Sequence, residues 1–134
     1  LKNEKNIKAS TEIVIINSFN LLSKFYEYCK IVFIGKSLVK KLKSVGGQNP
    51  LEAARKGCKV YHGPYVYNFF EIYEFLKLNN VSVKIINHKD LAKNIIQDLK
   101  NSQKINTKII KKINQHGEKI LNIVLLQIYK YLKI

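Results

Sequence analysis

The sequence predicts an α/β protein in which helices flank a parallel β-sheet. Four short segments rich in β-branched residues have the length and composition of strands: Glu12–Asn17, Ile31–Gly35, Lys59–His62 and Val81–Ile86. The first and second have the apolar character of buried strands. The segments between the four strands repeat apolar residues every three or four positions, which is typical of amphipathic helices. Strands that alternate with helices form βαβ units, so we expect a Rossmann-like parallel sheet.

Capping residues predict the helix boundaries. The helix Ser18–Cys29 begins with a serine that can cap it, and the helix Asn68–Leu78 begins with an asparagine in the same role. The helix Asn49–Gly57 begins with Asn-Pro and ends with glycine, which is the usual order of these residues. A fourth helix is predicted at His88–Asn101.

The C-terminal segment predicts a long helical tail. Ile and Leu recur at helical spacing over about 103–134, and Gly117 is expected to interrupt the helix. No repeat or low-complexity linker divides the chain. We therefore expect one domain over residues 1–134, with a core at about 11–101 and the tail behind it.

The positive charge admits two interpretations. The chain has 24 Lys and Arg residues against 9 Asp and Glu residues, which gives a formal net charge of +15. This charge favours polyanionic partners such as nucleic acid, an anionic membrane surface or a phosphorylated substrate. Nearly all the cations are Lys, and with abundant Ile and Asn this composition also arises from an AT-rich genome without any binding role.

Neither the cysteines nor the histidines form a metal-binding pattern. Cys29 and Cys58 are far apart in apolar surroundings, so we expect two buried free thiols and no disulfide or zinc site. His62, His88 and His116 have no metal-ligand spacing. We predict no metal and no cofactor. We find no apolar stretch typical of a signal peptide or a membrane span.

A candidate ligand site follows the second predicted strand. Ligands of open parallel sheets bind beyond the carboxyl ends of the strands, near helix N-termini. Here Gly46 and Gly47 allow close approach of the backbone, and Asn49-Pro50 begins a helix whose N–H groups can face a phosphate. Glu52 can accept hydrogen bonds from ribose hydroxyls, although stabilisation of its own helix N-terminus explains it equally well.

Three ordered blocks resemble one family of enzymes. They are Phe33–Leu38 (FIGKSL), Gly46–Ala54 (GGQNPLEAA) and His62–Ile72 (HGPYVYNFFEI). They resemble the patterns F-[IV]-G-x-S-L, G-G-[HQ]-N-P-[LI]-E-[AP]-A and G-P-x-x-x-N-F-x-[ED]-I of 3-deoxy-D-manno-octulosonic acid (Kdo) transferases. The resemblance covers about residues 12–90, and the C-terminal tail matches less well.

The resemblance implies a glycosyltransferase of the GT-B type, which has two Rossmann-like domains. Such enzymes transfer Kdo from CMP-Kdo to a lipid A precursor at the cytoplasmic face of the bacterial inner membrane. This chain would be the C-terminal, donor-binding domain, and its implied partners are CMP-Kdo, the lipid A precursor, the N-terminal domain and, peripherally, the anionic membrane surface. A fragment on its own would be cytoplasmic. Nucleic acid is not an expected partner.

The resemblance also implies a set of donor-binding residues. Those expected to bind CMP or to shape its site are Phe19, Asn20, Leu21, Ser37, Gly46, Gly47, Gln48, Asn49, Pro50, Leu51 and Glu52. Those expected at the sugar pocket are Gly63, Pro64 and Asn68. Tyr65 and Tyr67 suit the sugar pocket too, but burial explains them equally well.

The chain departs from the family pattern in three ways. Asn20-Leu21 replaces the family's Gly-Glu, and Lys40–Val45 lengthens the loop before Gly46. No segment matches the N-terminal domain, which carries the family's catalytic glutamate, so we assign no catalytic residue and expect the isolated chain to be inactive. The alternatives are a degenerate or split family member and a basic nucleic-acid-binding module. Against the latter, there is no RNA-binding signature and the aromatic residues fall at core spacings.

Overall fold

A computed structural model describes residues 8–17, 21–101 and 107–132 of the chain. It contains a three-stranded parallel sheet in the order β1-β2-β3, formed by β1 (Ile31–Ile34), β2 (Lys59–His62) and β3 (Ser82–Lys84). Ile31 is paired with Lys59, and Val60 with Ser82. The predicted parallel α/β sheet is confirmed, and so are three of its four predicted strands.

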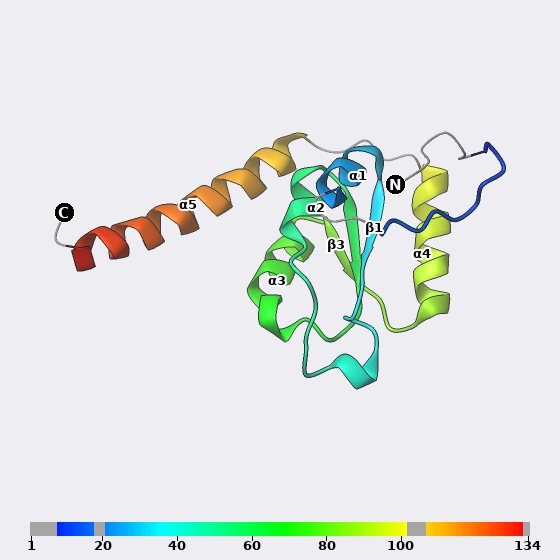
Figure 1. Ribbon diagram of the computed structural model, residues 1–134, viewed down its shortest axis with the longest axis horizontal. Coiled ribbons are helices and arrows are strands. Elements are labelled where there is room, and N and C mark those ends of the chain that lie inside the picture. The colour runs from blue at the N-terminus through cyan, green and yellow to red at the C-terminus, as the bar shows by residue number, and fades with distance from the viewer. Residues whose placement is uncertain (1–7, 18–20, 102–106, 133–134) are drawn as a thin grey trace.

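Helices cover both faces of the sheet. They are α1 (Leu22–Tyr28), α2 (Leu51–Arg55), α3 (Phe70–Leu78), α4 (His88–Asn101) and α5 (Thr107–Leu132). Figure 1 shows α4 on one side of the sheet and α1, α2 and α3 on the other. The beginning of α5 packs against α2 on this second side, whereas the rest of α5 extends away from the body of the protein. This is a three-layer α/β arrangement.

The main hydrophobic core lies between the sheet and the helices α1, α2, α3 and α5. Its members include Ile34, Val60, Leu76 and Ile113, all of which are buried. Full burial of each such side chain contributes about 1.5–3 kcal/mol. The small side chains of Ala53–Ala54 are also buried there and allow α2 to lie close to the sheet. The core therefore fixes α2, whose N-terminus borders the predicted ligand site.

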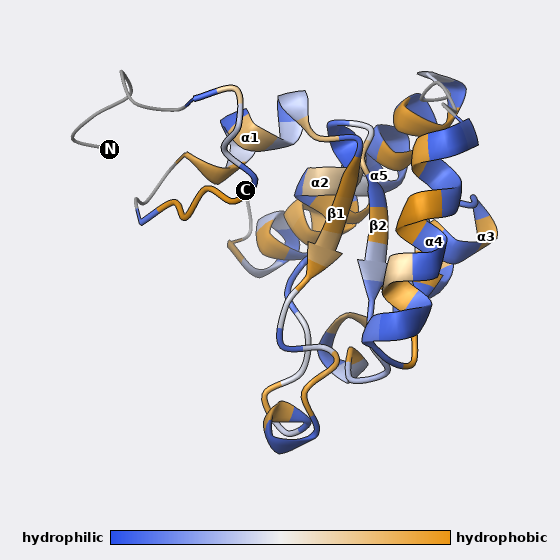
Figure 2. Cartoon of the chain, turned by 90° about the vertical axis from the view of Figure 1, so that its right-hand side faces the viewer, coloured by the Kyte–Doolittle hydropathy of each residue, from blue (hydrophilic) through white to orange (hydrophobic). Residues whose placement is uncertain are grey.

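The strand predicted at Glu12–Asn17 is wrong. The segment has no regular secondary structure, and Ile13 and Ile15 are 80% and 84% exposed. Figure 2 shows it as an apolar coil that does not join the sheet. A strand requires a neighbour to pair its backbone groups, and within the described residues β1 pairs with β2 alone. The β-branched residues make this segment suitable for a strand, but in the described part of the chain the segment has no neighbouring strand with which to pair.

Two capping predictions have different outcomes. Gly57, just beyond α2, has a positive φ of 81°, as expected of a glycine that ends a helix. Asn68 does not cap a helix: it lies within a 3-10 helix at Tyr67–Phe69, and its side chain bonds to a loop instead. The predicted cap Ser18 lies outside the described residues, and the described part of its helix is α1. The fourth helix, α4, has the predicted bounds.

The predicted interruption at Gly117 is wrong, because α5 is continuous through it. A single glycine costs a helix only about 1 kcal/mol relative to alanine. The Arg55 guanidinium of α2 lies against this glycine, so that an added Cβ would lie 2.2 Å from Nη2 of Arg55. The protruding part of α5 exposes apolar side chains, including Ile120, Val124 and Ile128. No described helix is long and apolar enough to cross a membrane.

The expectation of two buried thiols is half correct. Both cysteines are free, and Cys58 is buried, with its thiol donating to the backbone carbonyls of Tyr26 and Cys29. Cys29 is exposed. It directly follows the last residue of α1, so it lies beyond the helix whose apolar face enters the core.

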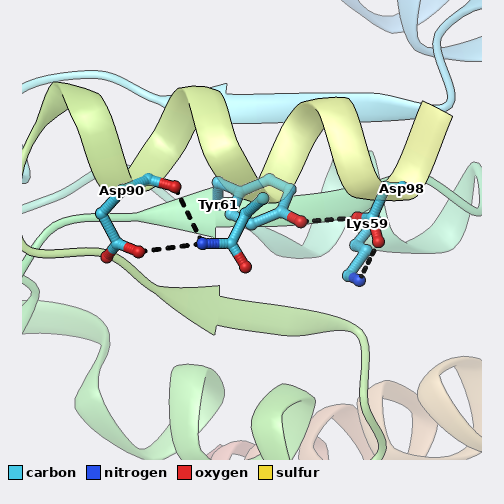
Figure 3. A network of polar contacts seen from close by, with 5 residues as sticks. Lys59, Tyr61, Asp90 and Asp98 are labelled. Carbon is cyan, nitrogen blue, oxygen red and sulfur yellow. Dashed lines mark hydrogen bonds and ion pairs between the residues drawn. The ribbon is translucent and has the colours of Figure 1, made fainter. Parts of the chain in front are cut away.

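A polar network attaches α4 to its own face of the sheet, opposite the one covered by α1, α2 and α3. Nζ of Lys59 lies 2.8 Å from Oδ1 of Asp98, and the hydroxyl of the fully buried Tyr61 donates to Oδ2 of Asp98. Figure 3 shows this carboxylate with its two partners; towards the beginning of α4, the Asn94 amide donates to the carboxylate and the backbone carbonyl of Asp90. Burial alone would raise the pKa of Asp98, but the hydrogen bonds from Lys59 and Tyr61 outweigh it and lower that pKa.

We predict that Asp98→Asn destabilises the fold by about 1–2 kcal/mol at neutral pH, because it weakens a charge-assisted pair in a partly buried place. The folded-state pKa of Asp98 is lowered. The ionised carboxylate therefore stabilises the fold above its unfolded pKa of about 3.9, and this contribution is lost as the pH falls through the folded pKa. Urea unfolding at pH 7 and pH 3 measures both effects.

The matched control is Glu118→Gln, a charge removal at an exposed position of α5. It should leave the free energy of unfolding within about 0.5 kcal/mol of the unmodified chain. Equal losses in the two variants would contradict the assigned role of Asp98.

Candidate functional site

Two loops meet at the carboxyl edge of the sheet. One loop, residues 35–50, follows β1, and the other, residues 63–66, follows β2. Because the strands are parallel, both loops leave the sheet at the same edge, which lies at the bottom of Figure 1. Together they hold most of the residues that the sequence assigned to a ligand. We call them the first and second edge loops.

The buried Ser37 joins the two edge loops. Its hydroxyl donates to the carbonyl of Ile34 at 2.6 Å and accepts the backbone N–H of Gly63 at 2.9 Å. Its own carbonyl accepts the N–H of Tyr65 at 2.9 Å. A fully buried hydroxyl needs such partners, because an unsatisfied one costs about 1–3 kcal/mol. The structure therefore uses Ser37 to shape the edge.

Gly63 allows the backbones of the two loops to touch. A Cβ at this position would lie 2.2 Å from the carbonyl oxygen of Ser37 and 2.5 Å from Cα of Leu38. Both are backbone atoms, so no side-chain rotation can relieve the overlap. Glycine is required here by the close approach of two chains.

Asn68 fixes the two glycines of the first edge loop. Its Nδ2 donates to the carbonyl of Gly47 at 2.9 Å. Its Oδ1 occupies the place of a side chain at Gly46, where a Cβ would lie 2.3 Å away. Gly46 also has a φ of 75°, in the left-handed region that favours glycine. The structure thus brings Asn68 to the predicted nucleotide loop, where its amide is engaged.

The N-terminus of α2 follows these glycines. Oδ1 of Asn49 accepts the N–H of Leu51 at 2.9 Å, and Pro50 is buried beneath the turn. The next N–H groups of the first turn have no partner within the helix, as in any helix. Glu52 lies in this turn and is exposed. Since α2 has only 5 residues, its dipole is small, and individual amides and side chains must hold any ligand.

Two buried rings lie behind the first edge loop. The Tyr73 hydroxyl donates to the carbonyl of Gln48 at 2.9 Å, and its ring centroid lies 4.2 Å from that of His62. His62 Nδ1 lies 2.8 Å from the carbonyl of Gly63, a contact in which the nitrogen must be the donor. Burial lowers the pKa of His62, so the imidazole is neutral at pH 7. Helical spacing in the segment Asn68–Leu78 indicates an apolar face for Tyr73, and this pattern does not reveal the hydrogen bond of its hydroxyl.

The predicted donor-binding segment Phe19–Leu21 is described only at its last residue. Phe19 and Asn20 lie outside the described residues, and Leu21 occupies the N-cap position of α1. Helix α1 packs against α2, and burial together with the charge of Glu52 raises the pKa of Tyr26 in α1. Helix α1, which begins after Leu21, therefore lies on the same side of the sheet as α2.

The remaining site residues differ in accessibility. Pro64 is exposed in the second edge loop, whereas Tyr65 is half-buried. Lys40, Lys41 and Lys43 are exposed around a 3-10 helix in the first edge loop. Figure 1 shows this helix beyond the ends of the strands. It gives the candidate site a cationic border.

A separate hollow lies away from these loops. It has a volume of about 360 Å³ and is open to solvent along β3, where its lining includes Lys59, Lys77 and Ser82. None of the predicted ligand residues lines it. Among the described residues, no group of three His, Cys, Asp or Glu side chains could hold a metal ion. The edge loops are thus the better candidate site because their geometry is built by buried polar contacts.

The fold and the edge loops define an α/β protein with a candidate ligand site at the carboxyl edge of a parallel sheet. No protein-family model matches the chain. It is similar to a 3-deoxy-D-manno-octulosonic acid transferase of Aquifex aeolicus, with 27% identity over 60% of this chain and 22% of the relative. It is also similar to one of Haemophilus influenzae, with 30% identity over 70% of this chain and 21% of the relative.

These similarities support a relationship to the Kdo transferases, the family that the three sequence blocks resemble. The chain spans about a fifth of the length of these curated relatives, 22% and 21%.

We predict opposite effects of alanine at two glycines. Gly63→Ala should destabilise the fold by about 1–3 kcal/mol, because its Cβ meets backbone atoms of Ser37 and Leu38. Gly117→Ala should stabilise it by up to about 1 kcal/mol, because alanine favours the helix and the Arg55 guanidinium can move aside. Urea unfolding of both variants measures the difference. A stable Gly63→Ala variant would contradict the close approach of the two loops.

Proposed function

We propose that this chain is the donor-binding part of a CMP-Kdo-dependent glycosyltransferase that transfers Kdo to a lipid A precursor. One observation carries the proposal: the three blocks that resemble Kdo transferases are separate in the sequence, and side-chain hydrogen bonds join their loops at one edge of the sheet. Ser37 links the first block to the third, and Asn68 links the third to the second. The parallel sheet brings the loops to one edge, and these polar side chains fix the loops against each other there, which is where open parallel sheets bind their ligands.

In this proposal the nucleotide lies over the segment Gly46–Glu52. The two glycines are buried against the side chains of Asn68 and Val66, so they shape the loop from within, and the amides of the first turn of α2 face the phosphate. The exposed carboxylate of Glu52 accepts hydrogen bonds from the ribose hydroxyls. The sugar lies towards Gly63 and Pro64. Asn68 acts there mainly by holding the glycine loop, since its amide already donates to Gly47.

The proposed enzyme has the GT-B architecture, with a second Rossmann-like domain that binds the acceptor and supplies the catalytic base. Donor and acceptor meet between the two domains in such an arrangement. No catalytic residue is assigned to the present chain. The reaction takes place at the cytoplasmic face of the bacterial inner membrane, where the chain associates peripherally with the anionic surface.

We predict that Glu52→Ala weakens CMP binding about 5- to 30-fold, because a charged hydrogen-bond acceptor contributes on the order of 1–2 kcal/mol. Titration calorimetry with CMP measures the dissociation constant. The control is Glu71→Ala, which removes a carboxylate from the first turn of α3 and should change CMP affinity by less than about twofold. Unchanged affinity in Glu52→Ala would remove this residue from the site.

The membrane partner is tested through the lysines of the first edge loop. We predict that the chain binds vesicles containing anionic phosphatidylglycerol and is released as salt rises towards about 0.5 M. Replacing Lys40, Lys41 and Lys43 by Gln should weaken binding about 100-fold, since each lysine near the surface contributes about 1 kcal/mol. Co-sedimentation at matched ionic strength gives the partition coefficient.

The control for this experiment replaces three exposed lysines elsewhere, Lys77, Lys84 and Lys100, by Gln, which keeps the net charge of the two variants equal. An equal loss in both variants would show attraction by overall charge and no role for the loop. Tighter retention on RNA than on vesicles would favour a nucleic-acid-binding module. Absence of vesicle binding at low salt would refute the membrane partner.

A further inference from the structure

Tyr73 bridges the hydrophobic core and the candidate nucleotide loop. Its side chain projects from the middle of α3 and is 2% exposed. Its hydroxyl donates to the carbonyl of Gln48 at 2.9 Å. Gln48 itself is exposed and lies between Gly47 and the turn that begins α2. A buried residue thus holds one peptide group of an otherwise accessible loop.

The ring of Tyr73 is fixed from several sides, so its hydroxyl has a defined position. The His62 ring lies 4.2 Å from it, centroid to centroid, at an interplanar angle of 45°. The backbone carbonyl of Tyr73 accepts the hydroxyl of Ser82 from β3 at 3.1 Å. Burial raises the pKa of Tyr73, so the phenol stays protonated and remains a donor at every physiological pH.

The hydrogen bond between Tyr73 and Gln48 constrains the part of the first edge loop that has the greatest conformational freedom. Gly46 and Gly47 precede Gln48, and glycine loses more conformational freedom on folding than any other residue. Asn68 holds the carbonyl of Gly47, and Tyr73 holds the next carbonyl along the chain. These two hydrogen bonds restrict the backbone after Gly47. The restricted segment extends to the turn in which Oδ1 of Asn49 accepts the N–H of Leu51.

We propose that Tyr73 is a positioning residue for the nucleotide. Its hydroxyl orients the peptide between Gln48 and Asn49 and thereby presents the amides of the first turn of α2 to the phosphate. This inference rests on the proposed function, because it concerns the affinity of the same site. Tyr73 makes no contact with the ligand in this scheme, and its effect on binding comes from preorganisation of the loop.

The test compares two tyrosines whose buried hydroxyls both make hydrogen bonds. Tyr73→Phe keeps the ring in the core and removes the bond to Gln48. Tyr61→Phe removes a buried hydroxyl that bonds to Asp98 on the opposite face of the sheet. Tyr61→Phe should lower stability at least as much as Tyr73→Phe, because its hydroxyl bonds to a charged carboxylate, so it controls for a general loss of stability. CMP affinity is measured by calorimetry, and amide hydrogen exchange of residues 47–53 is measured without ligand.

We expect Tyr73→Phe to weaken CMP binding about tenfold and to accelerate exchange in residues 47–53, whereas Tyr61→Phe changes neither by more than about twofold. Unchanged CMP affinity in Tyr73→Phe overturns the inference while the proposed function stands. Equal weakening by both variants also overturns it, since general stability would then explain the effect. If the unmodified chain does not bind CMP, the proposed function fails and the positioning role fails with it.

Discussion

The contact between the backbones of Gly63 and Ser37 is the constraint on which the edge of the sheet depends. It sets the spacing of the two edge loops, because a side chain at Gly63 would overlap backbone atoms on the other loop. Ser37 can accept the Gly63 N–H only at this separation. Once the second edge loop is held there, the chain leads into the turn that carries Asn68 against Gly46. The shape of the candidate nucleotide loop, Gly46–Glu52, therefore depends on a contact outside that segment.

Buried polar groups and exposed ones have different tasks at this edge. The hydroxyls of Ser37 and Tyr73 are buried and satisfied by backbone carbonyls, so they define geometry and tolerate little change. Glu52 and the lysines of the first edge loop are exposed. Their interactions with the rest of the fold are weak, so they are free to respond to a ligand. This division explains how a short helix can have a well-defined N-terminus although its dipole is small.

The sequence predicted the elements that its local patterns determine. The strands β1, β2 and β3 and the helix α4 follow from periodicity and turn residues, and the convergence of the loops follows from the rule that parallel strands end at one edge. The failures concern partners that are distant in sequence. Glu12–Asn17 has the composition of a strand without a neighbour to pair with, and Asn68 bonds to Gly47, 21 residues away, in place of its own helix. The space beside Gly117 belongs to Arg55, which helical periodicity does not reveal.

The departure at Asn20-Leu21 changes the electrostatics of the proposed site. Where the family pattern has a glutamate, this chain has Leu21, so Glu52 is the only acidic residue among the assigned donor-binding residues. The added Lys40, Lys41 and Lys43 lie on the same edge. Both changes make the local potential more positive, which favours the phosphate of a nucleotide over the neutral nucleoside. In the proposed site, recognition of the ribose would then depend more on a single carboxylate, and the fixed geometry of the loop before it would be correspondingly more important.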